Sequence, residues 1–511
     1  MSIRICVVLG QALRPGPGER RFISALTGDP RFELTALTTA PAVAERVPSG
    51  VQRLIDIEQL AFKVPDTAPK EIPPVAPFDP QALSDCDVIV DFSHSGAVLD
   101  LAARARHGLW RLSAFEPGAG FAEARDRAPV TEVQLVSHGA GGSVETLSTA
   151  AYDTKFLASR NRAFIREKSV QMVLQALARL VATGSAVAGI DGPLPVRRGA
   201  DVFRAHDVPV YLGRTVQELV RRALFAAGER LGRRPGMFSL RLGTGDRLRF
   251  DPGSATDLVP QNNEFWADPF LFEHEGALYL FYETYDYRTR LGHLSVGRVE
   301  GDRLVPLGDA LKRPYHLSFP FVLSHGDEIL MIPETHETKR TEVWRATTFP
   351  TEWELAATAF QGVATADTVV FQHQGRWWLF TNICNDSFND FGSELHLFMI
   401  DGPMLNEVVP HPLNPVVIDT RTARGGGRVF CENGRLYRTS QDNSHGVYGY
   451  GLNVMEITRL DETGYQETRL RHVLPDFTDG IMACHHMDAA AGRFVIDVRR
   501  RALGGPDLWR R

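Results

Sequence analysis

The segment "WADPFLFEHEGALYLFYE" (266–283) consists of two apolar runs joined by a short polar turn that contains a glycine. This pattern is typical of a β-hairpin. Related segments follow at "SFPFVLSHGDEILMIPE" (318–334) and "ADTVVFQHQGRWWLFTN" (366–382), and more divergent ones at "GGRVFCENGRLYRTSQ" (426–441) and "ACHHMDAAAGRFVIDVR" (483–499). The sequence therefore contains five copies of one hairpin at a nearly constant spacing.

Further strand-like sequence follows the first four copies, for example "GHLSVGRV" and "ELHLFMI". A hairpin with one or two additional strands is the make-up of a propeller blade. A long β-sandwich would also contain these strands, but it would not require the regular period. We therefore expect an all-β five-bladed propeller over residues 250–505.

The chain has 511 residues, which is more than one hydrophobic core usually supports, so several domains are expected. Its formal charge of -6 gives no reason to expect nucleic acid as a partner. Five widely spaced cysteines without a CxxC pair favour a reducing compartment. The N-terminus has too few apolar residues for a signal peptide, and no apolar stretch reaches about 18 residues. We expect a cytoplasmic protein without a membrane span, and peripheral membrane association stays open.

Residues 1–185 have a different pattern, in which strands such as "IRICVVLG" and "CDVIVDFSHSG" alternate with helical segments. The alternation predicts an α/β domain, whose ligands would bind beyond the strand ends near Asp91, Ser93 and His94. The string "APVTEVQLV" resembles the formyltransferase family, and "SRNR…KSVQMVLQAL" is similar to a helix of bacterial proteins that also contain a related C-terminal region. The first resemblance implies a Rossmann-like, formyltransferase-like fold. The family's catalytic His and Asp have no counterpart in "GLWRLSAFEPGAG" or "SHGAGGSVETL", so we expect a degenerate domain.

Residues 186–249 are rich in glycine and proline and are predicted to be a linker. Within them, "TVQELVRRALFAAGERLG" (215–232) has the apolar periodicity of an amphipathic helix, which we expect to pack between the domains. The basic residues around this helix are expected to be solvated.

Acidic residues occupy several open ends of the hairpins. In a blade, the start of the first strand and the end of the second lie on the same side of the propeller, so these positions should meet at the channel mouth. In the five copies they hold Asp268 and Glu283, Phe319 and Glu334, Asp367 and Asn382, Gly426 and Gln441, and Cys484 and Arg499. Paired carboxyl groups are what glycosidic chemistry requires, and clustered acids raise each other's pKa. The predicted catalytic set is Asp268, Glu283, Glu334 and Asp367, although acids at strand ends are often only solvated.

The fourth copy is the most polar part of the chain. Its glycines would let backbone N–H groups approach a ligand, and its arginines would bind carboxylate or phosphate, as in an anionic sugar, a nucleotide-sugar or a lipid head group. A plain glycine-rich turn is the alternative. The predicted substrate-binding residues are Trp266, Asn382, Arg424, Arg428, Arg438, Gln441, Asp442, His445, Tyr448 and His485. Adjacent residues on a strand point to opposite faces, so His485 and His486 are not expected to share a metal. We expect no cofactor, and a nucleotide-sugar is a candidate donor.

Two family resemblances bear on the function. The "ADP" string resembles the propellers of glycoside hydrolase family 43, which implies that Asp268 is a general base, while Phe319 stands where that family has a second Asp. The strings "WADPFLF", "SFPFVL", "HPLNPVVIDTRTARGGGRVF" and "GRLYRTSQDNSHGVYG" resemble the propeller region of plant glucosamine inositolphosphorylceramide transferases and of bacterial proteins that share it. In the plant proteins a separate glycosyltransferase domain follows this region. The resemblance implies glycoconjugate biosynthesis.

Three hypotheses follow. In the first, the protein transfers or trims a sugar or glycolipid, with Asp268 as base or nucleophile, Glu334 or Glu283 as proton donor, and Asp367 as an orienting neighbour. In the second, it is a non-catalytic glycan-recognition scaffold, in which the stacking surfaces are Trp266, Trp377, Trp378 and Tyr448. In the third, the N-terminal domain transfers a formyl or acyl group to an amino sugar.

Overall fold

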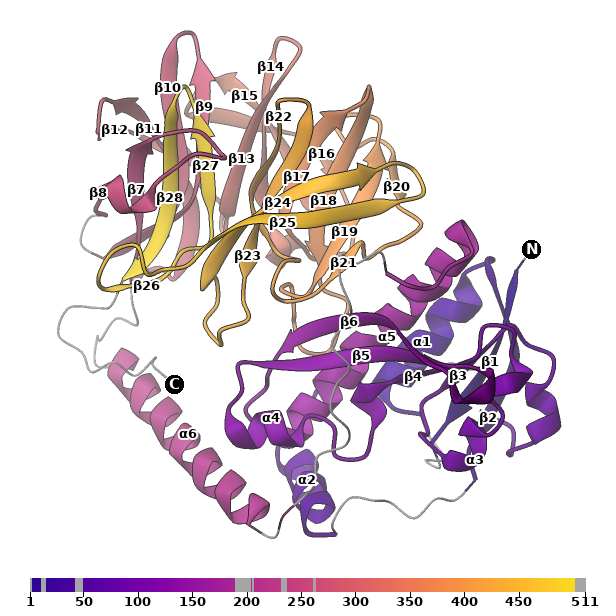
Figure 1. The fold of residues 1–511 in the computed structure, drawn as a ribbon. Helices are drawn as coiled ribbons and strands as arrows, with labels where there is room; N and C mark the ends of the chain where they lie inside the picture. Colours follow the sequence, from indigo (N-terminus) through magenta and orange to yellow (C-terminus); the bar gives the residue numbers. More distant parts are fainter. Residues whose placement is uncertain are drawn as a thin grey trace. The chain divides into compact units, whose positions relative to one another are not determined.

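The computed structural model describes residues 2–10, 15–41, 49–188, 204, 206–230, 237–260 and 263–500. The chain forms two compact units (Figure 1). Unit 1 consists of Met1–Arg222 together with Asn385–Asp390, and unit 2 consists of Ala223–Cys384 together with Phe391–Arg511. Among the described helices, none is both long enough and apolar enough to cross a bilayer.

Unit 1 contains a mixed sheet with the strand order β2-β1-β3-β4-β5-β6 in its described residues. The first four strands are parallel, whereas β5 is antiparallel to both of its neighbours. The strands are β1 (Ile3–Leu9), β2 (Phe32–Thr39), β3 (Val88–Asp91), β4 (Leu109–Leu112), β5 (Val130–His138) and β6 (Val144–Asp153). The helices are α1 (Pro17–Gly28), α2 (Ser49–Ala61), α3 (Gly96–Leu99), α4 (Phe121–Asp126) and α5 (Ala158–Thr183). The sheet fits the expected α/β class, and the formyltransferase-like assignment stays a prediction.

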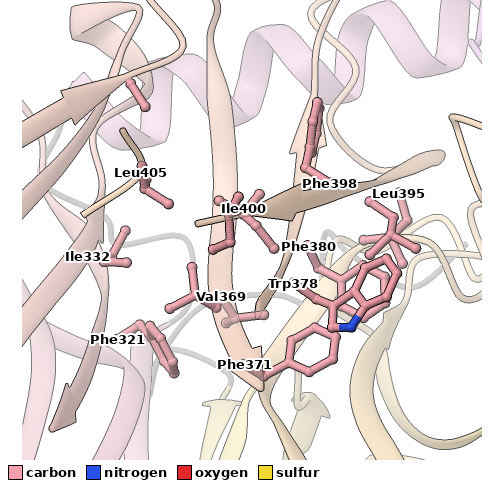
Figure 2. Close-up of a cluster of buried hydrophobic side chains, with 14 of the residues drawn as sticks. Phe321, Ile332, Val369, Phe371, Trp378, Phe380, Leu395, Phe398, Ile400 and Leu405 are labelled. Carbon is pink, nitrogen blue, oxygen red and sulfur yellow. The ribbon is translucent and has the colours of Figure 1, made fainter. Parts of the chain in front are cut away.

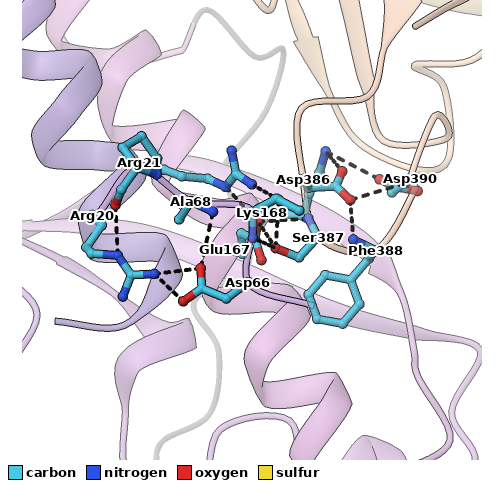
Figure 3. A network of polar contacts seen from close by, with 12 residues as sticks. Arg20, Arg21, Asp66, Ala68, Glu167, Lys168, Asp386, Ser387, Phe388 and Asp390 are labelled. Carbon is cyan, nitrogen blue, oxygen red and sulfur yellow. Dashed lines mark hydrogen bonds and ion pairs between the residues drawn. The ribbon is translucent and has the colours of Figure 1, made fainter. Parts of the chain in front are cut away.

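Helix α5 has two buried charged residues, and the segment Asn385–Asp390 pairs with both (Figure 3). The Nζ atom of Lys168 lies 3.0 Å from Asp386 Oδ2 and 3.5 Å from Asp390 Oδ2. Glu167 Oε1 accepts hydrogen bonds from the backbone N–H and the hydroxyl of Ser387, both at 2.9 Å. Because buried charges are stable only when paired, these contacts explain why this segment belongs to unit 1.

The predicted linker contains more regular structure than the sequence indicates. Residues 189–203, 205 and 231–236 lie outside the described residues, but helix α6 (Asp207–Arg230) is longer than the helix predicted at 215–232. Its buried side is fixed in unit 1 by Tyr211, whose hydroxyl contacts the Glu58 carboxylate and accepts a hydrogen bond from Ala158 N at 2.9 Å. The opposite face is exposed, and the predicted packing of this helix between the domains stays a prediction.

Unit 2 is the predicted five-bladed β-propeller, with five sheets in its described residues (Figure 1). In strand order the blades are β9–β12, β13–β16, β17–β20, β22–β25, and β26-β28-β7-β8, with β21 beside β19 and β27 beside β28. The strands are β7 (Met237–Thr244), β8 (Thr256–Leu258), β9 (Glu264–His274), β10 (Ala277–Asp286), β11 (Leu291–Glu300), β12 (Arg303–Leu311), β13 (Ser318–His325), β14 (Glu328–Glu334), β15 (Thr341–Thr348), β16 (Glu352–Ala359), β17 (Thr365–His373), β18 (Arg376–Ile383), β19 (Glu394–Ile400), β20 (Val408–Pro410), β21 (Val417–Ile418), β22 (Gly425–Glu432), β23 (Arg435–Asp442), β24 (Gly451–Leu460), β25 (Tyr465–Val473), β26 (Ile481–Ala483), β27 (Met487–Ala490) and β28 (Arg493–Arg500).

The fifth blade closes the ring with strands from both ends of the propeller. β7 pairs with β28 in antiparallel register, although β7 lies within residues 186–249 that were predicted to be a linker. The propeller therefore begins at Met237 rather than at residue 250. A short sequence window could not indicate this, because the partner strand lies far along the chain.

Apolar side chains fill the spaces between blades. Figure 2 shows one such cluster, in which Phe321 and Ile332 of the second blade pack near Val369 and Phe371 of the third. Trp378 is 3% exposed within this cluster, and Trp377 packs against it. Trp266 likewise lies 4.9 Å from the Tyr282 ring, measured between centroids, against another cluster. The three tryptophans predicted as stacking surfaces therefore contribute to packing, and a role of the partly buried Trp266 and Trp377 in stacking on a sugar stays a prediction.

Candidate active site at one end of the propeller channel

Equivalent positions in three blades share an unusual backbone conformation. Asp268, Phe319 and Asp367 have φ of 49°, 50° and 51°, and the hairpin register shifts beside each of them. A residue with a side chain in the left-handed region costs about 1–2 kcal/mol, and such residues cluster at functional sites. The same bulge at each of these strand starts takes the side chain out of the regular alternation of the strand.

The carboxyl groups of two blades meet on one guanidinium group. Arg424 Nε donates to Asp367 Oδ2 at 2.8 Å, and its Nη2 lies 3.5 Å from Glu334 Oε2. Gln441 Nε2 is 3.4 Å from the same oxygen of Asp367. The predicted convergence of blades two, three and four is therefore present in the structure.

The fifth blade supports the first through a buried histidine. His485 Nδ1 lies 2.6 Å from Asp497 Oδ2, and His485 Nε2 lies 3.5 Å from Asp268 Oδ1. Asp497 is fully buried and accepts hydrogen bonds from the backbone N–H groups of His485 and His486 at 3.0 and 2.9 Å. All five blades thus contribute a charged side chain to this cluster, and Asp497 is a member that the sequence pattern does not indicate.

Burial raises the pKa values of two of these carboxyl groups toward neutral pH. Burial raises the pKa of Asp268 to about 6, although the neighbouring His485 opposes the shift. Burial also raises the pKa of Asp367 to about 7 against the effect of Arg424, and the nearby carboxylates of Glu334 and Asp268 add to the increase. Both groups can therefore exchange protons in the physiological range.

The pKa values of the two neighbouring glutamates, Glu334 and Glu283, are shifted in opposite directions. Burial alone would raise the pKa of Glu334, but a 2.8 Å hydrogen bond with His336 and the charge of Arg424 lower it to about 2. Burial raises the pKa of Glu283 well above its usual value, and the nearby carboxylates of Asp268 and Glu334 add to this shift. At neutral pH Glu334 is ionised, whereas Glu283 keeps its proton to higher pH than an ordinary glutamate does. Environments that move similar groups apart in this way are typical of acid–base sites.

A band of aromatic and imidazole rings extends from this cluster. Neighbouring ring centroids along it are 4.7 to 6.3 Å apart. In order, its members are Tyr448, His485, Phe238, Phe265, Tyr285, His316, His336 and Phe391. Only Tyr448 and His485 are predicted from the sequence, and Tyr448 is 47% exposed. Aromatic rings beside carboxyl groups suit the faces of sugar rings.

Three residues predicted to bind substrate have internal partners instead. Arg428 donates to Asp488 Oδ2 at 2.9 Å and to the backbone carbonyls of Leu271 and Val322, which belong to inner strands of other blades. Its side chain therefore crosslinks the interior of the propeller.

Arg438 and Asn382 are also internal. Arg438 donates two hydrogen bonds of 2.6 Å to Glu467 and is 2% exposed. Asn382 is fully buried, where its Oδ1 accepts from Gly425 N at 3.0 Å and its Nδ2 donates to Glu394 O at 2.7 Å. Both side chains are therefore held by internal partners, although Arg438 Nη1 is buried without a hydrogen-bond partner among the described residues.

Asp442 and His445 form a separate group. Asp442 Oδ2 lies 2.9 Å from His472 Nε2 and 3.6 Å from His445 Nδ1, while the His445 ring stacks on Tyr450 at 4.1 Å. These contacts join the group to β25 and to the residue that precedes β24, and its role in the substrate site stays a prediction.

Among the residues that the structure describes, one group has ligand atoms close enough for a metal ion. The donor atoms of Asp268, His485 and Asp497 lie within 4.8 Å of one another. His485 contacts one carboxylate with each ring nitrogen, and burial, which lowers its pKa, is outweighed by Asp497. A proton on each ring nitrogen of His485 accounts for both contacts. The group therefore fits a protonated imidazole better than a bound metal ion.

The predicted strand-end site of unit 1 is saturated by its own partners. Asp91 is 1% exposed, and its Oδ2 accepts from Arg111 Nε and Nη2 at 2.8 and 2.6 Å. Its Oδ1 accepts from the Ser93 hydroxyl at 2.5 Å. His94 Nε2 is 2.9 Å from the Leu112 carbonyl, and burial, with the charge of Arg111, lowers the pKa of His94 to about 4. These contacts fix the loop after β3 and leave Asp91 without a free lone pair for a substrate.

Comparison with known proteins gives a family context for unit 2. Residues 253–491 match the family described as glucosamine inositolphosphorylceramide transferase 1, N-terminal. The propeller is similar to that region. The rice protein of this name (Oryza sativa subsp. japonica) is 34% identical over 245 residues, which are 46% of this chain and 32% of the relative. The Arabidopsis thaliana protein is 32% identical over 269 residues, which are 50% of this chain and 34% of the relative.

The chain spans about a third of the length of these curated relatives. Among solved structures, an alpha-L-arabinofuranosidase from Lactobacillus brevis is 14% identical, with a TM-score of 0.36, over 48% of this chain and 87% of that chain.

Proposed function

We propose that the propeller binds a sugar at the cluster of Asp268, Glu334 and Arg424 and catalyses transfer of a glycosyl group to a hydroxyl group or to water. The observation that supports this most directly is the difference between two carboxyl groups of neighbouring blades. The pKa of Asp268 is about 6, and that of Glu334 is about 2. A proton-exchanging group beside a permanent anion is the pairing that glycosidic chemistry needs.

In this proposal Asp268 is the general base. It takes the proton of the attacking hydroxyl group as the new bond to the anomeric carbon forms, and the bond from that carbon to the leaving group breaks with its electron pair. Glu334 stays ionised and stabilises the positive charge that develops on the sugar ring. The low pKa of Glu334 argues against its predicted role as proton donor. Glu283, whose pKa burial raises well above its usual value, stays the candidate proton donor for the leaving group.

The substrate that we propose is the sugar head group of a glycolipid, with an amino sugar as the first choice. Two observations support it. The relatives are named as glucosamine transferases that act on inositolphosphorylceramide. The cluster also brings a carboxylate and an aromatic face close together, because Arg424 contacts Glu334 at 3.5 Å and lies 5.2 Å from the centroid of the exposed Tyr448 ring. An ammonium group is stabilised by both kinds of group.

The experiment is a comparison of binding and turnover in the full chain. Glucosamine, N-acetylglucosamine and glucose are titrated by calorimetry, and glycolipids that carry these sugars are incubated with the protein and analysed by mass spectrometry. Asp268→Asn should bind as the wild type does and lose turnover by about 10²-fold or more. Asp327→Asn, in the exposed turn of the second blade, serves as the matched control. Unchanged turnover in Asp268→Asn would exclude the proposed base.

The second candidate is glycan recognition without catalysis, and the ring band from Tyr448 to Phe391 favours it. Recognition requires only shape and stacking, so sugar binding with no turnover in the wild type would support this candidate. Tyr448→Ala should then raise the dissociation constant of the sugar by about tenfold, because stacking contributes roughly 1 kcal/mol or more.

A further inference from the structure

Among the described residues, helix α6 contacts unit 1 through side chains on one of its faces. Tyr211 is fully buried and contacts Glu58, and the Thr215 hydroxyl accepts a hydrogen bond from Arg127 Nη2 at 3.0 Å. Arg214 Nη1 donates to the carbonyl of Arg125 at 2.8 Å. These contacts determine which face of the helix points away from the unit.

The outward face is apolar and exposed. Its side chains follow the spacing of one helical face. They are Leu212 (45% exposed), Val216 (60%), Leu219 (39%), Val220 (52%) and Leu224 (60%), and we call this set the α6 apolar face. Ile57 (64%) and Leu60 (77%) are exposed on α2, the helix whose Glu58 contacts Tyr211. A cluster of exposed apolar side chains of this kind is typical of an interaction surface.

The charge of this helix is opposite to that of the whole chain. Helix α6 (Asp207–Arg230) has four arginines and three acids, 4 - 3 = +1, while the chain carries -6. One of the acids is Glu218, whose carboxylate is bonded to Arg221 and Arg222 at 2.7 Å each. The sequence continues beyond the helix with Arg233 and Arg234. An exposed apolar face with a net positive charge is the pattern of a helix that lies in a membrane interface.

We propose that the α6 apolar face inserts into the surface of an anionic membrane. The charge decides between this occupant and a second copy of the chain, since pairing two such helices would bring like charges together, whereas anionic head groups neutralise them. The proposal does not depend on the sugar chemistry of unit 2. It would place the protein at the surface where a glycolipid substrate is found.

The test is flotation of the full chain with vesicles of phosphatidylcholine alone and of phosphatidylcholine with about one fifth phosphatidylglycerol, at low and high salt. The wild type should bind the anionic vesicles at least about tenfold more tightly than the neutral ones, and salt should weaken the binding. Val216→Glu with Val220→Glu should reduce it by at least about tenfold, because buried apolar area and charge complementarity are both lost. Leu355→Glu with Leu470→Glu is the matched control, since these side chains are exposed on the propeller (43% and 55%).

Circular dichroism checks that both double variants are folded. Absence of wild-type binding to either vesicle would overturn the proposal, as would equal binding to neutral and anionic vesicles. A wild-type dimer that becomes monomeric in Val216→Glu with Val220→Glu, without vesicle binding, would assign the face to a second copy. Sugar binding should be the same in all of these variants, so failure of the membrane proposal is distinguishable from failure of the proposed sugar chemistry.

Discussion

His485 Nδ1 lies 2.6 Å from Asp497 Oδ2 in the fully buried interior of the fifth blade. Asp497 is 0% exposed and accepts hydrogen bonds from two backbone N–H groups, which stabilise its negative charge. That charge favours the protonated form of the His485 imidazole. The other nitrogen of His485 faces Asp268 at 3.5 Å. This arrangement makes His485 a positioning residue that sets the charge beside the proposed base.

Replacing His485 should move the pH dependence of turnover. The His485 cation opposes the rise in the pKa of Asp268, so His485→Gln should raise that pKa above about 6. Because the base must be ionised, the acidic limb of kcat/KM should shift to higher pH, with a larger loss at pH 6 than at pH 8. The measurement is a full pH–rate profile, with His373→Gln, at the turn end of β17, as the control. A uniform loss at every pH would indicate a merely structural role.

Replacing Arg428 should destabilise the propeller without acting through a ligand. Arg428→Met leaves Asp488, which is fully buried, with Arg247 as its remaining cationic partner at 3.1 Å. Loss of one partner of a buried ion pair costs about 3–5 kcal/mol, and urea denaturation should show a decrease of this order. Arg435→Met removes an arginine that is 66% exposed and should change stability by less than about 0.5 kcal/mol. Equal stability of the two variants would contradict the internal role of Arg428.

The blade repeat and the position of the acids could be predicted because both depend on local sequence. A hairpin is encoded by adjacent residues, and the repeated "ADP", "SFP" and "ADT" strings place Asp268 and Asp367 at equivalent strand starts. Because the blades surround one axis, equivalent positions of different blades are expected to lie near one another at one end of the channel. The contacts of Arg424 with both Asp367 and Glu334 confirm this expectation.

The remaining assignments depend on contacts between distant strands. Arg428 and Arg424 look alike in "ARGGGRVF", yet one crosslinks the interior and the other faces the carboxyl cluster. Gly427 explains the difference, because its φ of 143° turns the chain and a Cβ there would lie 2.3 Å from the Met487 carbonyl. Asp497 lies in an apolar strand, where the sequence pattern gives no sign that His485 is its partner.

The Glu334–His336 pair should make stability depend on pH at the basic side. The hydrogen bond with Glu334 raises the pKa of His336 in the folded state. The stabilisation is therefore complete below the unfolded pKa of 6.5 and is lost as the pH rises through the higher folded value. His336→Gln should cost about 1 kcal/mol at pH 5.5 and less at pH 9, since the side chain is partly exposed. Denaturant titrations at both pH values check this, and His206→Gln, at a side chain that is 63% exposed, should give no such difference.

Ionised Asp268 should lower the free energy of unfolding at neutral pH. Such a cost is expected of a residue whose role is functional rather than structural. Its pKa rises from 3.8 in the unfolded chain to about 6 in the folded protein, so the folded state holds the proton more tightly. The free energy of unfolding must then fall as the pH rises through this interval, by roughly 2–3 kcal/mol for this one group. Asp268→Asn removes the titration, and Asn tolerates the φ of 49° at this position. The variant should match the wild type at pH 4 and exceed it by that amount at pH 7.5, measured by urea denaturation. Asp327→Asn, in the exposed turn of the second blade, should leave the slope unchanged. A variant that is less stable than the wild type at pH 7.5 would show that the ionised Asp268 carboxylate stabilises the fold, and that folding lowers its pKa instead of raising it.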